Sequence, residues 1–215
     1  MNNKLKYIVV EGPIGVGKTS LAKRLAQSFG SDLLLEAAED NPFLEKFYKN
    51  PKQGALPAQL FFLMQRAQQI SELRQSDLFE PVRVADFLID KDRLFAEMIL
   101  DSDELSLYQQ MYDHLTLDAP TPDLVVYLQA PVDVLQGRIS KRGIRMEQRI
   151  GDDYLQRLSE SYSGFFHAYD DAPLLVVNAA EMDFVGNESD YQQLLARIQT
   201  AGKGRQYYNP ISIVA

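Results

Sequence analysis

The fold of this chain is decided by residues 7–20, which read YIVVEGPIGVGKTS. The apolar run from Tyr7 to Val10 predicts a buried strand. Residues 12–19 match the phosphate-loop pattern G-x-x-x-x-G-K-S/T, and apolar residues then recur at helical spacing from Leu21 to Phe29. A Gly-rich turn could also join a strand to a helix. The complete pattern in this strand–loop–helix setting favours a nucleoside triphosphate site.

The residue types of this loop suit an anion. Glycines allow successive backbone N–H groups to turn toward a phosphate, and the start of the following helix adds partial positive charge. Lys18 would hold the outer phosphates, and Thr19 would supply a hydroxyl ligand for Mg²⁺. The residues that we predict to hold ATP here are Gly12, Pro13, Ile14, Gly15, Val16, Gly17, Lys18, Thr19 and Ser20.

Composition narrows the class of protein. A chain of 215 residues with 46% hydrophobic and 24% charged residues predicts one globular domain, residues 1–215. The net charge of −8 argues against a nucleic-acid polymer as partner. There is no cysteine, and the two histidines show no metal-ligand spacing. The sequence has no signal peptide and no apolar run near the roughly 20 residues of a membrane span, so we expect a cytoplasmic protein without a membrane partner.

Apolar runs predict four more strands, at residues 32–36, 82–86, 123–128 and 174–177. Helical spacing predicts helices between them, including one that begins at Pro57 and runs to Leu73, whereas residues 202–215 match no element. This alternation predicts an α/β fold of three layers, a five-stranded parallel sheet with helices on both faces. Ligands of such sheets bind beyond the carboxyl ends of the strands.

Two acidic residues fall at that edge. Glu36 and Asp86 end the second and third predicted strands, beside the phosphate loop. A carboxylate there can hold Mg²⁺, with Thr19, or can orient an attacking hydroxyl group. The alternative for each acid is a helix N-cap or an exposed strand end.

A basic segment follows the fourth predicted strand. Its cations crowd into residues 138–149 and are Arg138, Lys141, Arg142, Arg145 and Arg149. Arginines stabilise the charge that spreads over a phosphoryl group during transfer. Such a run is often only a solvated surface. The phosphate loop elsewhere in the chain favours a lid at about residues 138–150, with Gly143 as its hinge.

The predicted helix after Pro57 carries two polar residues on one face. Gln59 and Arg66 are seven residues apart, close to two helical turns. Gln59 could form a bidentate pair with a base edge, and apolar neighbours such as Phe62 suggest a lined pocket around it. The alternative is a surface glutamine.

These residues together resemble the deoxyribonucleoside kinase family, which shares its fold with thymidylate kinase. The likeness extends from about Lys6 to Phe184. It implies transfer of a phosphoryl group from ATP, with Mg²⁺, to the 5′-hydroxyl of a deoxyribonucleoside. The family's catalytic glutamate matches Glu36 in LLLEAAEDNPFL, so Glu36, Lys18 and Arg142 are the catalytic residues that we expect.

The resemblance also implies how the nucleoside is bound. The family's sugar-binding tyrosine and base-reading glutamine match Tyr48 and Gln59 in FYKNPKQGALPAQLFF. Arg66 and Asp92 would face each other over the base, as in members that accept a purine deoxynucleoside or deoxycytidine, so we favour these over thymidine. The family's lid matches RISKRGIRMEQRI in this chain, which would place Arg138 and Arg142 toward the phosphates and Glu147 toward the 3′-hydroxyl. We also expect Arg145 and Asp86 to contact the ligands.

Two departures from the family pattern affect the cations. The family has Asp/Glu-Arg-Ser after the third strand, whereas this chain has Asp86-Phe87-Leu88. The role of the missing arginine near the 5′-position passes to Lys91 or Arg93, or is lost. A lid arginine two places after Arg142 is Ile144 here, with Arg145 next to it.

Other interpretations remain open at this stage. A thymidylate-type nucleoside monophosphate kinase would need an arginine near the end of strand two, but residues 33–42 contain none and carry Glu36, Glu39 and Asp40. A GTPase would need Asn-Lys-x-Asp, which is absent from the sequence. A non-catalytic P-loop nucleotide-binding module is the remaining alternative. The helix from Leu60 to Leu73 has more apolar surface than one face requires, so we expect a homodimer.

Overall fold

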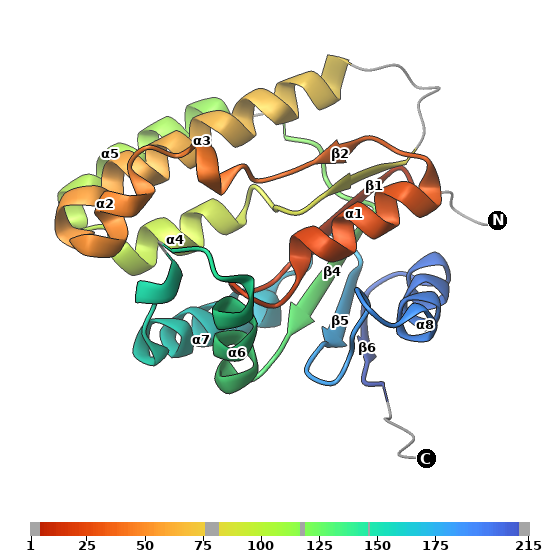
Figure 1. Ribbon diagram of the computed structural model, residues 1–215. Coiled ribbons are helices and arrows are strands. Elements are labelled where there is room, and N and C mark those ends of the chain that lie inside the picture. Colours follow the sequence, from red (N-terminus) through yellow and green to blue (C-terminus); the bar gives the residue numbers. More distant parts are fainter. Residues whose placement is uncertain (1–4, 76–81, 117–118, 146, 211–215) are drawn as a thin grey trace.

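The computed structural model describes residues 5–75, 82–116, 119–145 and 147–210. In these ranges the chain forms a six-stranded sheet of order β2-β3-β1-β4-β5-β6, and all neighbouring strands are parallel (Figure 1). The strands are β1 (Tyr7–Glu11), β2 (Leu33–Leu34), β3 (Arg83–Ala85), β4 (Leu124–Gln129), β5 (Leu174–Asn178) and β6 (Arg205–Tyr208). The predicted α/β class with a parallel sheet is confirmed.

The predicted count of five strands is wrong. β6 lies within residues 202–215, to which the sequence assigned no element. Its four residues, RQYY, alternate between exposed and half-buried positions at an edge of the sheet. The segment therefore has no apolar run of the kind that marks an interior strand of a parallel sheet.

Helices cover both faces of the sheet, as predicted. The side chains of β1 alternate, with Ile8 and Val10 in one apolar cluster and Tyr7 and Val9 in another. The first cluster includes α1 (Lys18–Phe29), α6 (Val132–Arg142) and α8 (Glu188–Gln199). The second includes α3 (Pro51–Gln75), α4 (Lys91–Ile99), α5 (Ser102–Leu115) and α7 (Asp152–Ala168), while the short α2 (Leu44–Lys49) packs on α3 (Figure 1).

The helix predicted to begin at Pro57 begins earlier, at Pro51, and Pro57 lies inside it. The helix continues through Pro57 because the carbonyl that loses its donor belongs to Gln53, which is exposed to solvent. Gly54 lets α2 and α3 approach closely, since a Cβ there would lie 2.4 Å from the backbone nitrogen of Phe47. α3 extends past the predicted end at Leu73, whose side chain lies outside the described residues.

The sheet order brings the predicted site together. β3 lies between β2 and β1, so the segments that follow these strands meet at one edge. β2 is shorter than the predicted strand 32–36, and Glu36 has already left the sheet. The backbone N–H of Glu36 donates to Asp86 Oδ1 at 2.7 Å, which fixes the segment after β2 beside the end of β3.

None of the described helices has the length and apolar character that crossing a lipid bilayer would require.

Candidate active site

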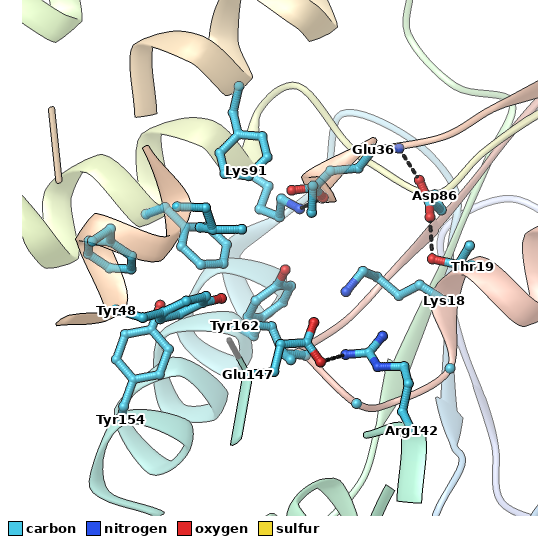
Figure 2. Close-up of a pocket in the computed structure, with 18 of the residues that line it drawn as sticks. Lys18, Thr19, Glu36, Tyr48, Asp86, Lys91, Arg142, Glu147, Tyr154 and Tyr162 are labelled. Atoms are coloured by element: carbon cyan, nitrogen blue, oxygen red, sulfur yellow. Dashed lines mark hydrogen bonds and ion pairs between the residues drawn. The ribbon is translucent and has the colours of Figure 1, made fainter. Parts of the chain in front are cut away.

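A cavity at the carboxyl edge of the sheet joins the phosphate loop to most of the predicted acceptor residues (Figure 2). From the loop and the start of α1 it is lined by Ile14, Gly15, Gly17, Lys18, Thr19 and Ser20. The other predicted residues on its wall are Glu36, Tyr48, Gln59, Phe62, Arg66, Asp86, Arg142 and Glu147. The cavity therefore has a phosphate-binding end and a polar and aromatic end.

The phosphate loop has the geometry of an anion cradle. Gly15 and Gly17 have φ angles of +86° and +106°, a region that favours glycine. A Cβ at Gly15 would lie 2.8 Å from the carbonyl oxygen of Leu135. Of the predicted loop residues, Gly12, Pro13 and Val16 lie behind the cavity wall. The Lys18 ammonium donates to the carbonyl of Gly12 at 2.8 Å and to that of Pro13 at 3.5 Å.

Electrostatics at Lys18 favour a bound anion. Burial lowers the pKa of Lys18, and the nearby charge of Lys91 lowers it further, whereas Glu11, Glu36 and Asp86 raise it. A triphosphate would add negative charge next to this ammonium group and stabilise its protonated form. The loop therefore fits the ligand that the sequence motif predicts.

Thr19 and Asp86 provide the oxygen pair expected for Mg²⁺. The Thr19 hydroxyl donates to Asp86 Oδ2 at 2.5 Å (Figure 2). Burial raises the pKa of Asp86, and its hydrogen bonds with Thr19 and the Glu36 backbone oppose that effect. Mg²⁺ prefers oxygen ligands and is commonly held by one or two protein groups together with substrate phosphates. This donor set, next to the cradle, fits the ion.

Glu36 lies across the cavity from the phosphate loop. Its Oε1 pairs with Arg66 Nη2 at 2.6 Å, and its Oε2 accepts from Lys91 Nζ at 3.3 Å. Burial alone would raise the pKa of Glu36, but the charges of Arg66, Lys91 and Lys18 outweigh burial and lower it to about 2. Glu36 is therefore ionised at neutral pH and able to accept a hydrogen bond from a hydroxyl group.

The structure brings Arg66 and Asp92 together. Arg66 Nη1 pairs with Asp92 Oδ1, and the guanidinium carbon lies 5.1 Å from the ring centre of Phe62. Arg66 lines the cavity, whereas the fully buried Asp92 stands behind it and does not, so Asp92 would act on a ligand through Arg66. Gln59, only 6% exposed, lies on the wall of the same cavity.

Aromatic and lid residues enclose the opposite side. Glu147, in a short 3₁₀ helix (Glu147–Arg149), pairs with Arg142 at the end of α6. Tyr48 and Tyr154 lie beside each other near Glu147 (Figure 2). This arrangement places the predicted sugar-binding residues Tyr48 and Glu147 on one wall.

Two predicted lid cations lie away from the cavity wall. Arg138 donates to the carbonyls of Val16 (3.1 Å), Ala179 (2.7 Å), Ala180 (3.4 Å) and Met182 (3.3 Å). It therefore ties the phosphate loop to the segment after β5. Arg145 is exposed and is not among the residues that line the cavity. Met146, within the predicted lid, lies outside the described residues.

Sequence reasoning missed several residues of the site. Phe47, Phe95, Tyr154 and Tyr162 line the cavity, and Glu11 lies behind it as a buried partner of Tyr162. The sequence does mark Glu11 as a candidate site residue, because this acid lies directly between an apolar run and the first glycine of the loop. Lys91, named only as one possible substitute for a missing arginine, also lines the cavity.

The phosphate cradle opposite an ionised carboxylate defines a class, the P-loop phosphotransferases that act on a hydroxyl acceptor. A family model described as deoxynucleoside kinase matches residues 8–201. The chain belongs to the deoxynucleoside kinase family, and it is a kinase that phosphorylates deoxynucleosides with ATP.

Individual relatives agree with this assignment. The chain is 38% identical over 205 residues to deoxyguanosine kinase of Bacillus subtilis (strain 168), covering 92% of this chain and 98% of that protein. It is 32% identical over 208 residues to deoxyadenosine kinase of Lactobacillus acidophilus, covering 90% and 95% of the two chains. The structure of deoxyadenosine kinase from M. mycoides with bound dATP shares the fold, with a TM-score of 0.78 at 24% identity over 91% of this chain and 100% of that one.

Proposed function

We propose that this kinase transfers the γ-phosphoryl group of ATP to the 5′-hydroxyl of a purine deoxyribonucleoside. The observation that carries the proposal is the position of ionised Glu36 on the same cavity as Lys18 and the phosphate loop. The names of the relatives, deoxyguanosine kinase and deoxyadenosine kinase, support a purine as the base. The Arg66–Asp92 pair, which holds the Arg66 guanidinium on the cavity wall, favours a purine or deoxycytidine over thymidine.

The residues between the two ends of the cavity would carry out the transfer step. Glu36 accepts the proton of the 5′-hydroxyl as its oxygen attacks the γ-phosphorus. Lys18, the loop amides and Arg142 hold the charge that spreads over the phosphoryl oxygens. Thr19 and Asp86 would hold Mg²⁺, which would neutralise negative charge on the phosphates. The enclosing aromatic residues exclude water and so suppress hydrolysis of ATP.

The nucleoside would be held at both of its ends. Gln59 would pair with the base edge, and Phe62 would pack against the base plane. Tyr48 and Glu147 would bind the 3′-hydroxyl of the sugar. Arg142 pairs with Glu147 and also borders the phosphate end, so closing of the lid would depend on both ligands.

We also propose that residues 1–215 form one domain that assembles as a homodimer. Met64 on α3 is 60% exposed, and Leu107 and Met111 on α5 are 48% and 37% exposed. α3 and α5 pack side by side (Figure 1), and the proposal is that a second copy covers the exposed apolar side chains of these two helices. We propose the cytoplasm as its compartment, because both ATP and free deoxynucleosides are present there.

A substrate panel tests the proposed function. ADP release is measured with ATP, Mg²⁺ and, in turn, deoxyguanosine, deoxyadenosine, deoxycytidine, thymidine and deoxyguanosine monophosphate. We expect the highest kcat/KM with a purine deoxyribonucleoside and the lowest with thymidine and the monophosphate. Turnover of the monophosphate alone would instead identify a nucleoside monophosphate kinase. Failure of every acceptor would indicate a nucleotide-binding protein without this activity.

A further inference from the structure

Lys91 is a buried cation at the first position of α4. Its side chain is only 2% exposed. Burial removes the hydration of an ammonium group, and the start of a helix carries partial positive charge. Both effects disfavour a cation at this position, so a strong source of negative charge must compensate for them.

Two carboxylates, one from each side of β3, supply that charge. Lys91 Nζ lies 3.0 Å from Glu11 Oε1 and 3.3 Å from Glu36 Oε2. Glu11 ends β1, Glu36 follows β2, and Lys91 follows β3, which lies between these two strands. The strand order therefore places the ammonium group between the two acids.

The two acids differ in their freedom to meet a substrate. Glu11 is fully buried, and its Oε1 also accepts from Leu88 N at 2.9 Å. Its Oε2 accepts from Gly12 N at 2.8 Å and from the Tyr162 hydroxyl at 3.0 Å. Both oxygens of Glu11 are thus engaged by fixed groups. Glu36 is 19% exposed and lies on the cavity wall. Glu11 is the anchor, and Glu36 is the acid that can meet an acceptor.

The neighbouring positions differ in how they relate to Glu36. Position 87, directly after Asp86, holds a buried phenylalanine and no cation. Arg93 is exposed, and its guanidinium lies 5.6 Å from the ring centre of Tyr112. Arg66 pairs with Asp92 at the base end and also holds Glu36 Oε1 at 2.6 Å, so Lys91 is the cation on the other oxygen, Oε2. Of the two substitutes that the sequence left open, Lys91 reaches the cavity and Arg93 does not.

We propose that Lys91, held by Glu11, is a positioning residue that fixes Oε2 of Glu36 and so directs Glu36 toward the acceptor hydroxyl group. This inference rests on the proposed function of the same site. In the transfer step the 5′-oxygen forms its bond to the γ-phosphorus while the bond from phosphorus to the bridging oxygen breaks. The electron pair of that bond goes to ADP, and the hydroxyl proton goes to Glu36. Lys91 keeps its protons throughout and fixes the geometry.

Steady-state kinetics of three variants test the assignment. Lys91→Met removes the charge, Lys91→Arg keeps it, and Arg93→Met removes a charge two residues away on the exposed side of the same helix. For Lys91→Met we expect kcat to fall by about 100-fold or more, with KM for ATP and for the deoxynucleoside changed by less than about threefold. Lys91→Arg should recover at least about tenfold of that loss, and Arg93→Met should match the wild type.

A double variant separates positioning from a structural role. Lys91→Met leaves Glu11 as an unpaired buried carboxylate, which destabilises the fold. Lys91→Met/Glu11→Gln removes both charges, so its melting temperature should rise above that of Lys91→Met while its kcat stays as low. Recovery of kcat together with stability would overturn the inference, as would an unchanged kcat in Lys91→Met. A wild-type protein without turnover on any deoxynucleoside would overturn the proposed function itself.

Discussion

Replacing Arg66 by methionine should destabilise the fold as well as weaken nucleoside binding. The Arg66 guanidinium is 4% exposed and pairs with Asp92, whose side chain is fully buried, and with Glu36 at 2.6 Å. Methionine keeps much of the packing against Phe62 but leaves the Asp92 carboxylate without its cation. Glu36 keeps Lys91 as a partner, so Asp92 is the carboxylate that is left without its cation.

The size of the effect follows from burial. Breaking a buried pair by removing one partner costs about 3–5 kcal/mol, because the remaining charge is uncompensated. For a chain of this length 1 kcal/mol corresponds to about 2–4 °C in melting temperature. Arg66→Met should therefore melt about 6–20 °C below the wild type at pH 7, as followed by circular dichroism.

A matched double variant tests the cause. Arg66→Met/Asp92→Asn carries no buried charge at this pair, so it should recover more than half of the lost melting temperature. KM for the deoxynucleoside should stay high in both variants, since Arg66 is missing from the cavity wall in each. An Arg66→Met protein that melts within about 2 °C of the wild type would refute the reasoning. A double variant no more stable than the single one would do the same.

Three further changes have expected outcomes. A pKa of Glu36 lowered from 4.5 to about 2 corresponds to about 3 kcal/mol of stability, present above pH 4.5 and lost as the pH falls toward 2. The difference in unfolding free energy between wild type and Glu36→Gln, measured in denaturant without metal, should shrink over that pH range; a constant difference would contradict it. Gly15→Ala should abolish ATP binding in calorimetry, because its Cβ would meet the Leu135 carbonyl and its φ is positive, whereas normal affinity would show that the loop tolerates a side chain. Met64→Glu should give monomers in sedimentation at micromolar concentration, and a dimer that persists would place the interface elsewhere.

Much of the site could be predicted because its residues lie next to strong local patterns. The phosphate loop combines a strand, a fixed glycine spacing and a helix, and each part agrees with the others. Glu36 and Asp86 follow apolar runs, and parallel strands bring their carboxyl ends to one edge. The phosphate loop, Glu36 and Asp86 therefore line one cavity at the carboxyl edge of the sheet, as the sequence predicts.

Residues whose roles depend on tertiary contacts could not be predicted in the same way. Arg138 belongs to a cationic run, yet it binds backbone carbonyls because the loop after β5 passes beside the phosphate loop. The choice between Lys91 and Arg93 depends on which side of α4 faces the sheet. β6 pairs with β5 at the sheet edge although its own residues carry no apolar signal.

The most direct test measures phosphoryl transfer in Glu36→Gln by rapid quench, with saturating ATP and Mg²⁺ and a purine deoxyribonucleoside as acceptor. Glu39→Gln, an exposed acid three residues away, is the matched control and should behave as the wild type. For Glu36→Gln we predict nucleoside affinity within about threefold of the wild type and a transfer rate lowered by about 10²- to 10⁴-fold. A transfer rate within about tenfold of the wild type would contradict the account, because the carboxylate facing Lys18 would then have no part in activating the hydroxyl.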